Sequence, residues 1–286
     1  YAEGQYEDAI TYLKRYESMS PQMLRNDLYM LGIAHIRLNR HYSSIPYFQR
    51  VTTEPDAMTE NAYLHLGNAY IRANDKENAR LAFEAALRTN FDKQVREEAL
   101  LNYALTTYET TSAFGESISA LEQFLDEFPN SKDADKVKNY LAMEYMATKN
   151  YEVAYQSIQK VARPNEKILE AKQYILYQLG TEAFARQDFN KAVDYFTLSI
   201  QNLPTGIYAP ESYYWRSESF YRLGMHQNSI DDLNAFFRLP GANRSNNYVP
   251  AHYGMGYAYF SQKNFRLAKE YFEKNMRNPY HNVQAR

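Results

Sequence analysis

The sequence predicts an all-α protein, an α-solenoid in which short helix pairs stack one after another. Two observations support this fold class. Apolar residues recur at helical spacing, in pairs of segments, along the 286 residues. Glycine and proline number only 10 each, which leaves few turn-forming residues for a protein made of strands. One helix pair alone buries too little apolar surface to be stable, so the pairs are expected to share a continuous core.

The clearest helix pair occupies residues 57–91. In its first helix, four residues at i, i+3, i+4 and i+7 share one face: Tyr63, Leu66, Gly67 and Tyr70. After a polar turn at 74–75, a second helix repeats the pattern with Ala79, Phe83 and Ala86. Gly67 and Ala79 let the two helix axes approach closely, and the aromatic rings fill the space beside them. A larger residue at Ala79 is expected to overpack this contact.

The same pattern recurs along the chain at intervals from 35 residues (32 to 67) to 39 residues (217 to 256). The residue in the place of Gly67 is Gly32, Leu105, Ala142, Gly180, Ser217 or Gly256 in the other repeats. We therefore predict a single array over 1–286 with about fifteen helices, wound into a right-handed superhelix. It comprises a half repeat at 1–20 and seven repeats at about 21–55, 56–91, 92–129, 130–164, 165–204, 205–243 and 244–280.

Three segments depart from this regular pattern. At 208–222, Arg216 takes the place of Leu66 and Trp215 stands beside it, so a helix is expected there but its rotation is open. The polar connector at 239–247 is the best candidate for a flexible joint. The half repeat lacks a preceding helix, and 278–281 looks like a loop into another repeat. We therefore expect a fragment of a longer chain whose terminal helices are the least stable.

The residues of the 57–91 pair carry a family resemblance. Six of them follow the pattern W-x2-L-G-x2-Y, then A-x3-F, with Tyr63 in place of tryptophan. The chain thus resembles the tetratricopeptide repeat (TPR) superfamily. The resemblance implies that first helices line a concave groove that binds an extended peptide. The segment 124–131 also resembles linkers of bacterial cell-envelope TPR proteins, which implies a periplasmic or envelope location; a cytoplasmic location is the alternative.

Composition and motifs exclude several function classes. A net charge of −2 and a pI of about 6.4 provide no basic excess for nucleic acid. No apolar run approaches the length of a transmembrane helix, and cysteine is absent. The six histidines form no metal-binding pair, so no metal or cofactor is predicted. The segment 115–119 begins like a nucleophile elbow but lacks its second glycine, and no enzymatic activity is predicted.

A second stripe on each first helix points to a binding surface. In 57–91 this stripe consists of Asn61, Leu64, Asn68 and Ile71. Aromatic residues fill one of the sixteen equivalent positions in the first four repeats but eight of twelve in the last three. The predicted partner-binding residues are Tyr174, Tyr177, Phe184, Tyr214, Glu218, Tyr221, Arg222, Tyr253, Tyr257 and Phe260. The other interpretation, that these rings pack against the next helix, stays open.

The predicted function is a non-enzymatic scaffold that binds a protein or peptide segment. The carboxylate clamp of chaperone-binding TPR domains is not reproduced, because Leu64 stands where a lysine is needed and Tyr140 replaces an arginine. One alternative is glycan capture by an aromatic platform, as in some outer-membrane proteins with TPR-like helices. Another is that the array is a non-catalytic region of a larger multidomain protein.

Overall fold

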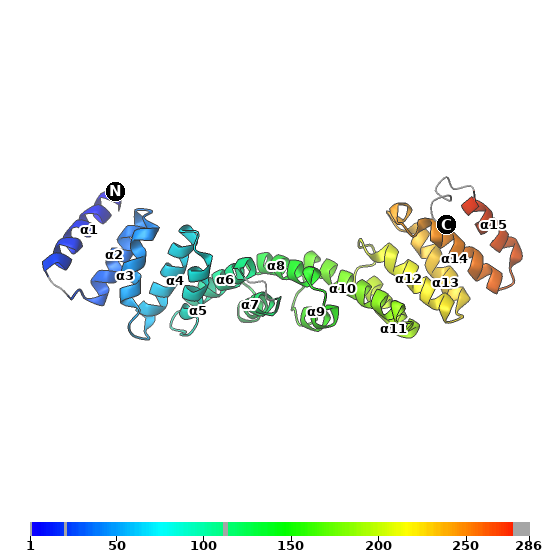
Figure 1. Ribbon diagram of the computed structural model, residues 1–286, viewed down its shortest axis with the longest axis horizontal. Coiled ribbons are helices and arrows are strands. Elements are labelled where there is room, and N and C mark those ends of the chain that lie inside the picture. Colours follow the sequence, from blue (N-terminus) through cyan, green and yellow to red (C-terminus); the bar gives the residue numbers. More distant parts are fainter. Residues whose placement is uncertain (1, 20–21, 111–113, 277–286) are drawn as a thin grey trace. The chain divides into compact units, whose positions relative to one another are not determined.

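The computed structural model describes residues 2–19, 22–110 and 114–276, and these form fifteen α-helices, one short 3-10 helix and no strand (Figure 1). The helices are α1 (Ala2–Met19), α2 (Arg25–Arg37), α3 (His41–Val51), α4 (Ala57–Arg72), α5 (Lys76–Ala86), α6 (Lys93–Thr110), α7 (Phe114–Glu127), α8 (Ala134–Ala147), α9 (Tyr151–Ile158), α10 (Glu166–Ala185), α11 (Phe189–Asn202), α12 (Ala209–Arg222), α13 (His226–Arg238), η1 (Ala242–Arg244), α14 (Tyr248–Ser261) and α15 (Phe265–Met276). The predicted all-α class and the helix number are confirmed.

The chain divides into two compact units, Tyr1–Leu141 and Ala142–Arg286. In the first unit each helix from α1 to α6 packs on its successor, and α4 also touches α6. In the second unit each helix from α9 to α14 packs on its successor, while α10 touches α12 and α12 touches α14. Such contacts between neighbours in sequence define a stack of helix-turn-helix repeats. The extent of a single array and the handedness of its superhelix stay predictions.

The contact between the two helices of a repeat depends on a missing side chain. A Cβ atom added to Gly67 would lie 2.3 Å from a ring carbon of Phe83. The same collision would occur between Gly180 and Phe196, at 2.5 Å, and between Gly256 and Phe272, at 2.4 Å. The phenylalanine ring therefore occupies the volume that a side chain on the first helix would need. This confirms the close approach predicted from the small residues.

In five of the described repeats, one residue with a left-handed backbone makes the turn between the two helices. The residue seven positions after the small residue adopts the left-handed conformation in five repeats: Asn39, Asn74, Gln187, Gly224 and Lys263. Next along the chain, the carboxylates of Asp75 and Asp188 accept hydrogen bonds from backbone N–H groups and so cap α5 and α11. The polar turn predicted at 74–75 is confirmed, and its geometry explains the constant spacing within repeats.

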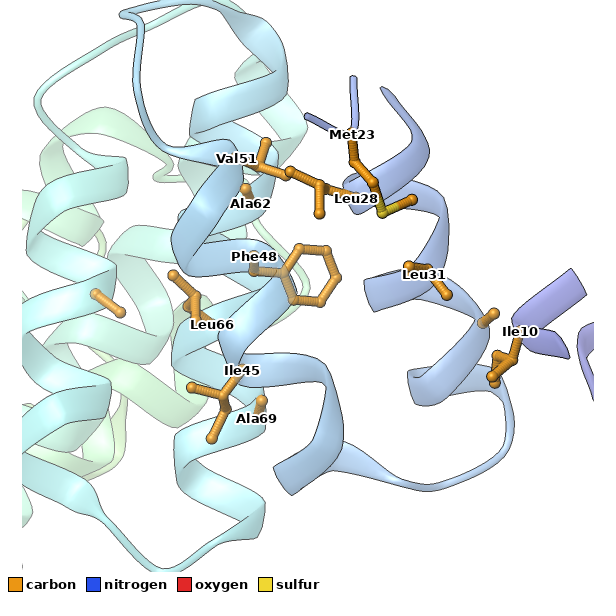
Figure 2. Packing of buried hydrophobic residues seen from close by; sticks show 12 residues of the cluster. Ile10, Met23, Leu28, Leu31, Ile45, Phe48, Val51, Ala62, Leu66 and Ala69 are labelled. Atoms are coloured by element: carbon orange, nitrogen blue, oxygen red, sulfur yellow. The ribbon is translucent and has the colours of Figure 1, made fainter. Parts of the chain in front are cut away.

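Apolar residues of consecutive helices merge into shared clusters. In the cluster drawn in Figure 2, Leu31 and Phe48 are fully buried, and Leu66 of the next repeat joins them. Ile10 of α1 is also buried in this cluster, with Tyr6 packed against it. Helix α2 covers the apolar face of this helix from the C-terminal side, and the lower stability expected of the terminal helices stays a prediction.

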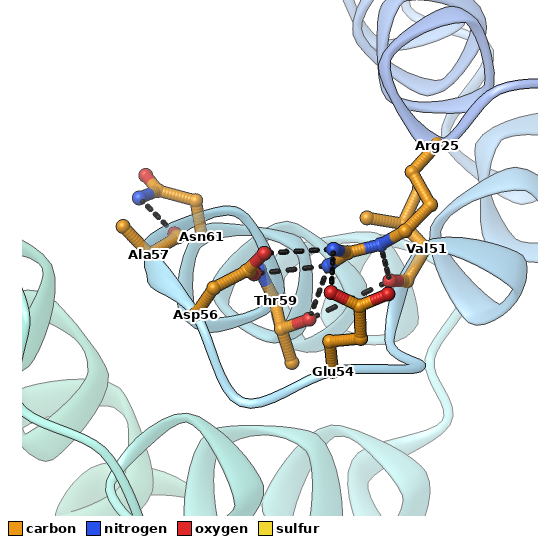
Figure 3. Close-up of polar contacts among 7 residues, drawn as sticks. All are labelled: Arg25, Val51, Glu54, Asp56, Ala57, Thr59 and Asn61. Carbon is orange, nitrogen blue, oxygen red and sulfur yellow. Dashed lines mark hydrogen bonds and ion pairs between the residues drawn. The ribbon is translucent and has the colours of Figure 1, made fainter.

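Polar side chains in the first turn of several first helices hold the loop that leads to the next repeat. Arg25 donates to the backbone oxygen of Val51 at 3.0 Å and to both carboxylate oxygens of Asp56 at 2.7 and 2.9 Å (Figure 3). One repeat later, the buried carboxylate of Glu60 accepts the backbone N–H groups of Phe91 and Asp92, each at 3.0 Å. These bonds fix the start of the following helix in both cases.

The connector 239–247 is also tied to the helices beside it. It contains η1, and Ala242 is buried. The carboxylate of Glu211 accepts hydrogen bonds from Ser245 and Asn247. A segment held in this way differs from the flexible joint expected from its composition, because the Glu211 carboxylate on α12 accepts hydrogen bonds from two of its side chains.

Candidate functional site

The ten predicted binding residues lie on three first helices of the second unit, α10, α12 and α14. Their places relative to the small residue of each helix decide how accessible they are. Three tyrosines precede that residue by three positions: Tyr177, Tyr214 and Tyr253. Most of the others follow it by one to five positions: Phe184, Glu218, Tyr221, Arg222, Tyr257 and Phe260.

Two of the preceding tyrosines pack between helices. Tyr214 is 7% exposed, and its ring lies 5.3 Å from Trp215 and 6.2 Å from Phe236. Tyr177 is half-buried, 6.2 Å from the ring of Phe196. Burial raises the pKa of both phenols. For these two rings the structure favours the interpretation of packing against a neighbouring helix, so they offer a partner little surface.

Tyr174 and Phe184 are half-buried at the edges of the same contact. The ring of Tyr174 lies 6.0 Å from Tyr151 and 5.2 Å from Tyr208, which comes just before α12. The ring of Phe184 lies 5.1 Å from Trp215. These half-buried side chains therefore join α10 to α9 and to α12.

Glu218, Tyr221 and Arg222 form a mixed polar and aromatic group on α12. Burial raises the pKa of the Glu218 carboxyl, and the positive charge of Arg222 partly offsets this. A Cβ atom on Gly254 would lie 3.3 Å from this carboxylate, so α14 approaches it closely. Tyr221 is half-buried beside the ring of His226, at 5.3 Å, while Arg222 is exposed. A partly buried carboxylate of this kind is suited to accept a cationic or hydrogen-bonding group from a ligand.

The aromatic residues of α14 are the most accessible of the set. Tyr257 is 54% exposed and Phe260 is 55% exposed. With Tyr253 and Phe272 they line an open apolar cavity of about 450 Å³. Phe272 is absent from the predicted set because its place in the second helix indicated only packing. Whether Phe272 contributes to the cavity depends on how much of its ring the neighbouring repeat covers, and the repeat spacing does not reveal this.

A second, polar cavity of about 720 Å³ was not predicted. It lies among α9, α10 and α11, and its lining includes Tyr151, Arg186, Lys191 and Tyr195. The hydroxyl of Tyr195 donates to Glu152 at 3.2 Å, and burial raises its pKa to about 12. These residues come from three segments with no common motif, so no sequence signal could assign them to one cavity.

Neither cavity shows the ligand set of a metal centre. The described part of the chain contains no group of three or more histidine, cysteine, aspartate or glutamate side chains that could hold a metal ion. None of the described helices combines the length and the apolar character needed to cross a bilayer. The surfaces described are one aromatic cavity, one polar cavity and the group on α12 with the partly buried Glu218 carboxylate, and such surfaces are suited to binding.

Comparisons with known proteins identify the repeats. One model of the tetratricopeptide repeat matches residues 29–94 and 64–132, and another matches 249–274. A comparison with curated proteins gave no match. The residues that these models match, 29–132 and 249–274, belong to the tetratricopeptide repeat superfamily. Repeats of this superfamily support a protein-interaction scaffold in general terms, and its members are typically non-catalytic.

Solved structures share the fold at low sequence identity. A tetratricopeptide repeat protein from Parabacteroides merdae is 15% identical with a TM-score of 0.40, over 90% of this chain and 93% of that one. The C-terminal part of a repeat-containing protein from Cytophaga hutchinsonii is 13% identical with a TM-score of 0.40, over 90% and 99%. The structure of Naa15/Naa10 bound to HypK-THB is 14% identical with a TM-score of 0.53, over 97% of this chain and 40% of that one.

Proposed function

We propose that the second unit binds an extended peptide segment of a partner protein along the exposed face of its first helices. The observation that carries this proposal is the row of side chains that follow the small residue on α12 and α14. Glu218 and Tyr221 on α12 and Tyr257 on α14 retain accessible surface, while the preceding Tyr177 and Tyr214 are packed between helices. Aromatic rings on a rigid surface are frequent anchors in protein interfaces.

The partly buried carboxylate of Glu218 indicates the chemistry of the peptide. A lysine or arginine side chain of the ligand would pair with this carboxylate and offset the desolvation free energy of its partial burial. Arg222 lies one turn further along the helix and is exposed, so it is free to approach an acidic group of the ligand. The preferred peptide therefore combines a basic residue with apolar residues that contact Tyr221 and Tyr257.

The test is selection of binding peptides from a random library displayed on phage, followed by calorimetry with the purified chain. We expect Tyr221→Ala and Glu218→Gln to weaken the selected peptide about tenfold or more, a loss of about 1.4 kcal/mol or more. The matched control is Tyr42→Ala in the first unit, because Tyr42 is 79% exposed. The affinity of the Tyr42→Ala variant for the selected peptide should be unchanged.

Melting temperatures separate binding residues from core residues. Phe83→Ala should cost about 3–5 kcal/mol of stability, because Phe83 is fully buried. Tyr221→Ala should melt close to the original chain. If Tyr221→Ala unfolds as readily as Phe83→Ala, its ring belongs to the core. If affinity is unchanged in both α12 variants, the peptide binds elsewhere, and the polar column containing Asn26, Asn61 and Asn68 is the next candidate.

Glycan capture is the second candidate function. A sugar ring stacks on an exposed aromatic face, and Tyr257 offers one on α14. A glycan array with the same purified chain tests this alternative. Binding of an oligosaccharide that Tyr257→Ala abolishes, with no peptide selected, would favour it. The envelope location and the presence of further domains stay predictions from sequence alone.

A further inference from the structure

The polar cavity of about 720 Å³ lies beside two successive repeats of the second unit. The turn between α8 and α9 contributes Lys149 and Asn150 to its lining. The turn between α10 and α11 contributes Arg186 and Asp188. All of the lining residues fall between 149 and 195, and none of them is among the ten binding residues predicted from the sequence. The cavity is therefore separate from the exposed face of α12 and α14.

The carboxylates that line this cavity already have partners within the chain. The Glu152 carboxylate accepts a hydrogen bond from the Tyr195 hydroxyl at 3.2 Å. The Asp188 carboxylate accepts a backbone N–H group of α11, also at 3.2 Å. Glu182 forms an ion pair with Arg186 at 3.6 Å. The acceptors of the cavity are thus occupied by donors of the protein itself.

Two of the three cations in the lining have no such partner. In the ranges 2–19, 22–110 and 114–276, no carboxylate lies within 4.0 Å of the ammonium groups of Lys149 and Lys191. The Lys191 ammonium lies 5.6 Å from the centroid of the Tyr195 ring, a contact that positions it without neutralising its charge. The third cation, Arg186, has a side chain that is 78% exposed, and its single contact leaves most of its N–H donors open. The charge that is left to compensate is positive.

A phosphate monoester matches this charge. Near neutral pH it carries almost two negative charges and three acceptor oxygens, so it requires two cations where a carboxylate requires one. Lysine binds phosphate as a point charge. Asn150 adds a neutral donor, because its side-chain oxygen accepts the N–H of Val153 at 3.4 Å and its amide nitrogen stays available. The volume falls in the range of about 300–1,000 Å³ typical of sites for small organic groups, so the carrier of the phosphate also has room.

We propose that this cavity binds the phosphate monoester of an organic ligand, with Lys149 and Lys191 as the principal partners of its charge. Leu179, Ala183 and the ring of Tyr151 line the same cavity and offer a contact surface to the organic group. A phosphorylated side chain of a partner protein and a free small molecule provide the same chemistry. The inference goes beyond peptide binding along the first helices, because the site lies at the turns of the repeats.

Isothermal titration calorimetry of the full chain with phenyl phosphate tests the proposal. We expect saturable binding with a dissociation constant below about 1 mM. Benzoate has the same ring and one negative charge, and it should bind at least about tenfold more weakly. Lys149→Gln and Lys191→Gln should each weaken phenyl phosphate binding by about tenfold or more. Lys160→Gln is the matched control, because Lys160 is exposed in the same unit and does not line the cavity; its affinity should equal that of the original chain.

The pH dependence of binding gives a second readout. The second ionisation of a phosphate monoester has a pKa of about 6, so its dianion fraction falls about tenfold between about pH 7.5 and pH 5. The affinity for phenyl phosphate should fall with it. Any protonation of Glu152, Glu182 or Asp188 in this range would strengthen the binding of an anion, so it cannot imitate this loss.

Two more probes distinguish the sources of the phosphate. A phosphotyrosine peptide that binds more tightly than phenyl phosphate would indicate a partner protein, and adenosine monophosphate that does so would indicate a small molecule. The proposal is overturned by a dissociation constant above about 1 mM for phenyl phosphate, by equal binding of benzoate, by unchanged affinity in either lysine variant, or by no loss of affinity at about pH 5. Glu218→Gln and Tyr221→Ala should leave phenyl phosphate binding unchanged, so failure of this proposal is distinguishable from failure of extended-peptide binding.

Discussion

The helix pairs α4–α5 and α12–α13 have the same connectivity but different chemistry at the same position. In α4–α5, Leu66 and Ala82 are both buried, with 3% and 6% exposure. In α12–α13 the equivalent residues are Arg216 and Asp232, which form two hydrogen bonds of 2.7 Å each. The residues of each pair are sixteen positions apart, 66 to 82 and 216 to 232. The fold therefore requires that these two positions be complementary to each other, and apolar residues are one solution.

The ionic pair also contacts a third helix. The Arg216 guanidinium also donates to Thr197 of α11 at 3.0 Å and lies over the rings of Tyr213 and Phe220. Burial raises the pKa of Asp232, although Arg216 opposes the shift. Burying two charges costs desolvation free energy that their attraction has to offset. The buried ion pair thus holds three helices in a fixed arrangement, at some cost in stability. It also explains how a helix forms where Arg216 departs from the repeat pattern.

The largest expected effect comes from removing one charge of the ionic pair. Asp232→Ala should destabilise the chain by about 3–5 kcal/mol, because Arg216 stays buried without its partner. Urea denaturation followed by circular dichroism measures the loss. The double variant Arg216→Leu with Asp232→Ala copies the α4–α5 pair and should recover most of that stability. A double variant as unstable as the single one would show that the two positions are not interchangeable between repeats.

A smaller effect is expected at the close approach of the helices. Gly67→Ala should cost about 1–3 kcal/mol, because the new methyl group would meet the Phe83 ring at 2.3 Å. The corresponding residue of α12 is Ser217, and the residue in the place of Phe83 is Leu233, which has no ring. The Ser217 hydroxyl donates to the Tyr214 backbone oxygen at 2.6 Å. Ser217→Ala should cost roughly 1 kcal/mol or less. Thermal melting of both variants checks the contrast, and equal losses would contradict it.

The smallest expected effect concerns an ion pair close to the surface. Arg25 lowers the pKa of the Asp56 carboxyl well below its ordinary value of 3.8. The side chain of Asp56 is 42% exposed, so solvent screening limits the contribution to about 1 kcal/mol or less. Asp56→Asn keeps an N-cap oxygen for Thr59 and removes only the charge.

The sign of the pH dependence follows from the lowered pKa. The charged carboxylate contributes its full stability above the unfolded pKa of about 3.8 and loses it as the pH falls through the folded pKa. The stability difference between the original chain and Asp56→Asn should therefore be constant above about pH 5 and shrink below pH 4. Urea midpoints measured between pH 3 and pH 7 check this. A difference that grows on acidification would show that the charge is not stabilising.

The repeats could be predicted from sequence because their signals are local. Gly67 and Phe83, and their equivalents in later repeats, fall at fixed distances within about 35 residues. The aromatic enrichment on the last three first helices was also visible. Its division between core and surface was not, because Tyr214 and Tyr257 occupy neighbouring columns of the same stripe. Tyr214 is buried by the residues that surround it, while Tyr257 is exposed.

The sequence by itself determined the repeat, its turn and its close helix contact, since each depends on residues a few positions apart. Only the tertiary structure decided which rings are accessible and where cavities lie. It also showed that Glu60 and Glu211 hold loops about thirty residues away. Burial is set by what the following repeat places against a ring, as Trp215 does on Phe184. That information lies in contacts between repeats, and periodicity within a repeat does not contain it.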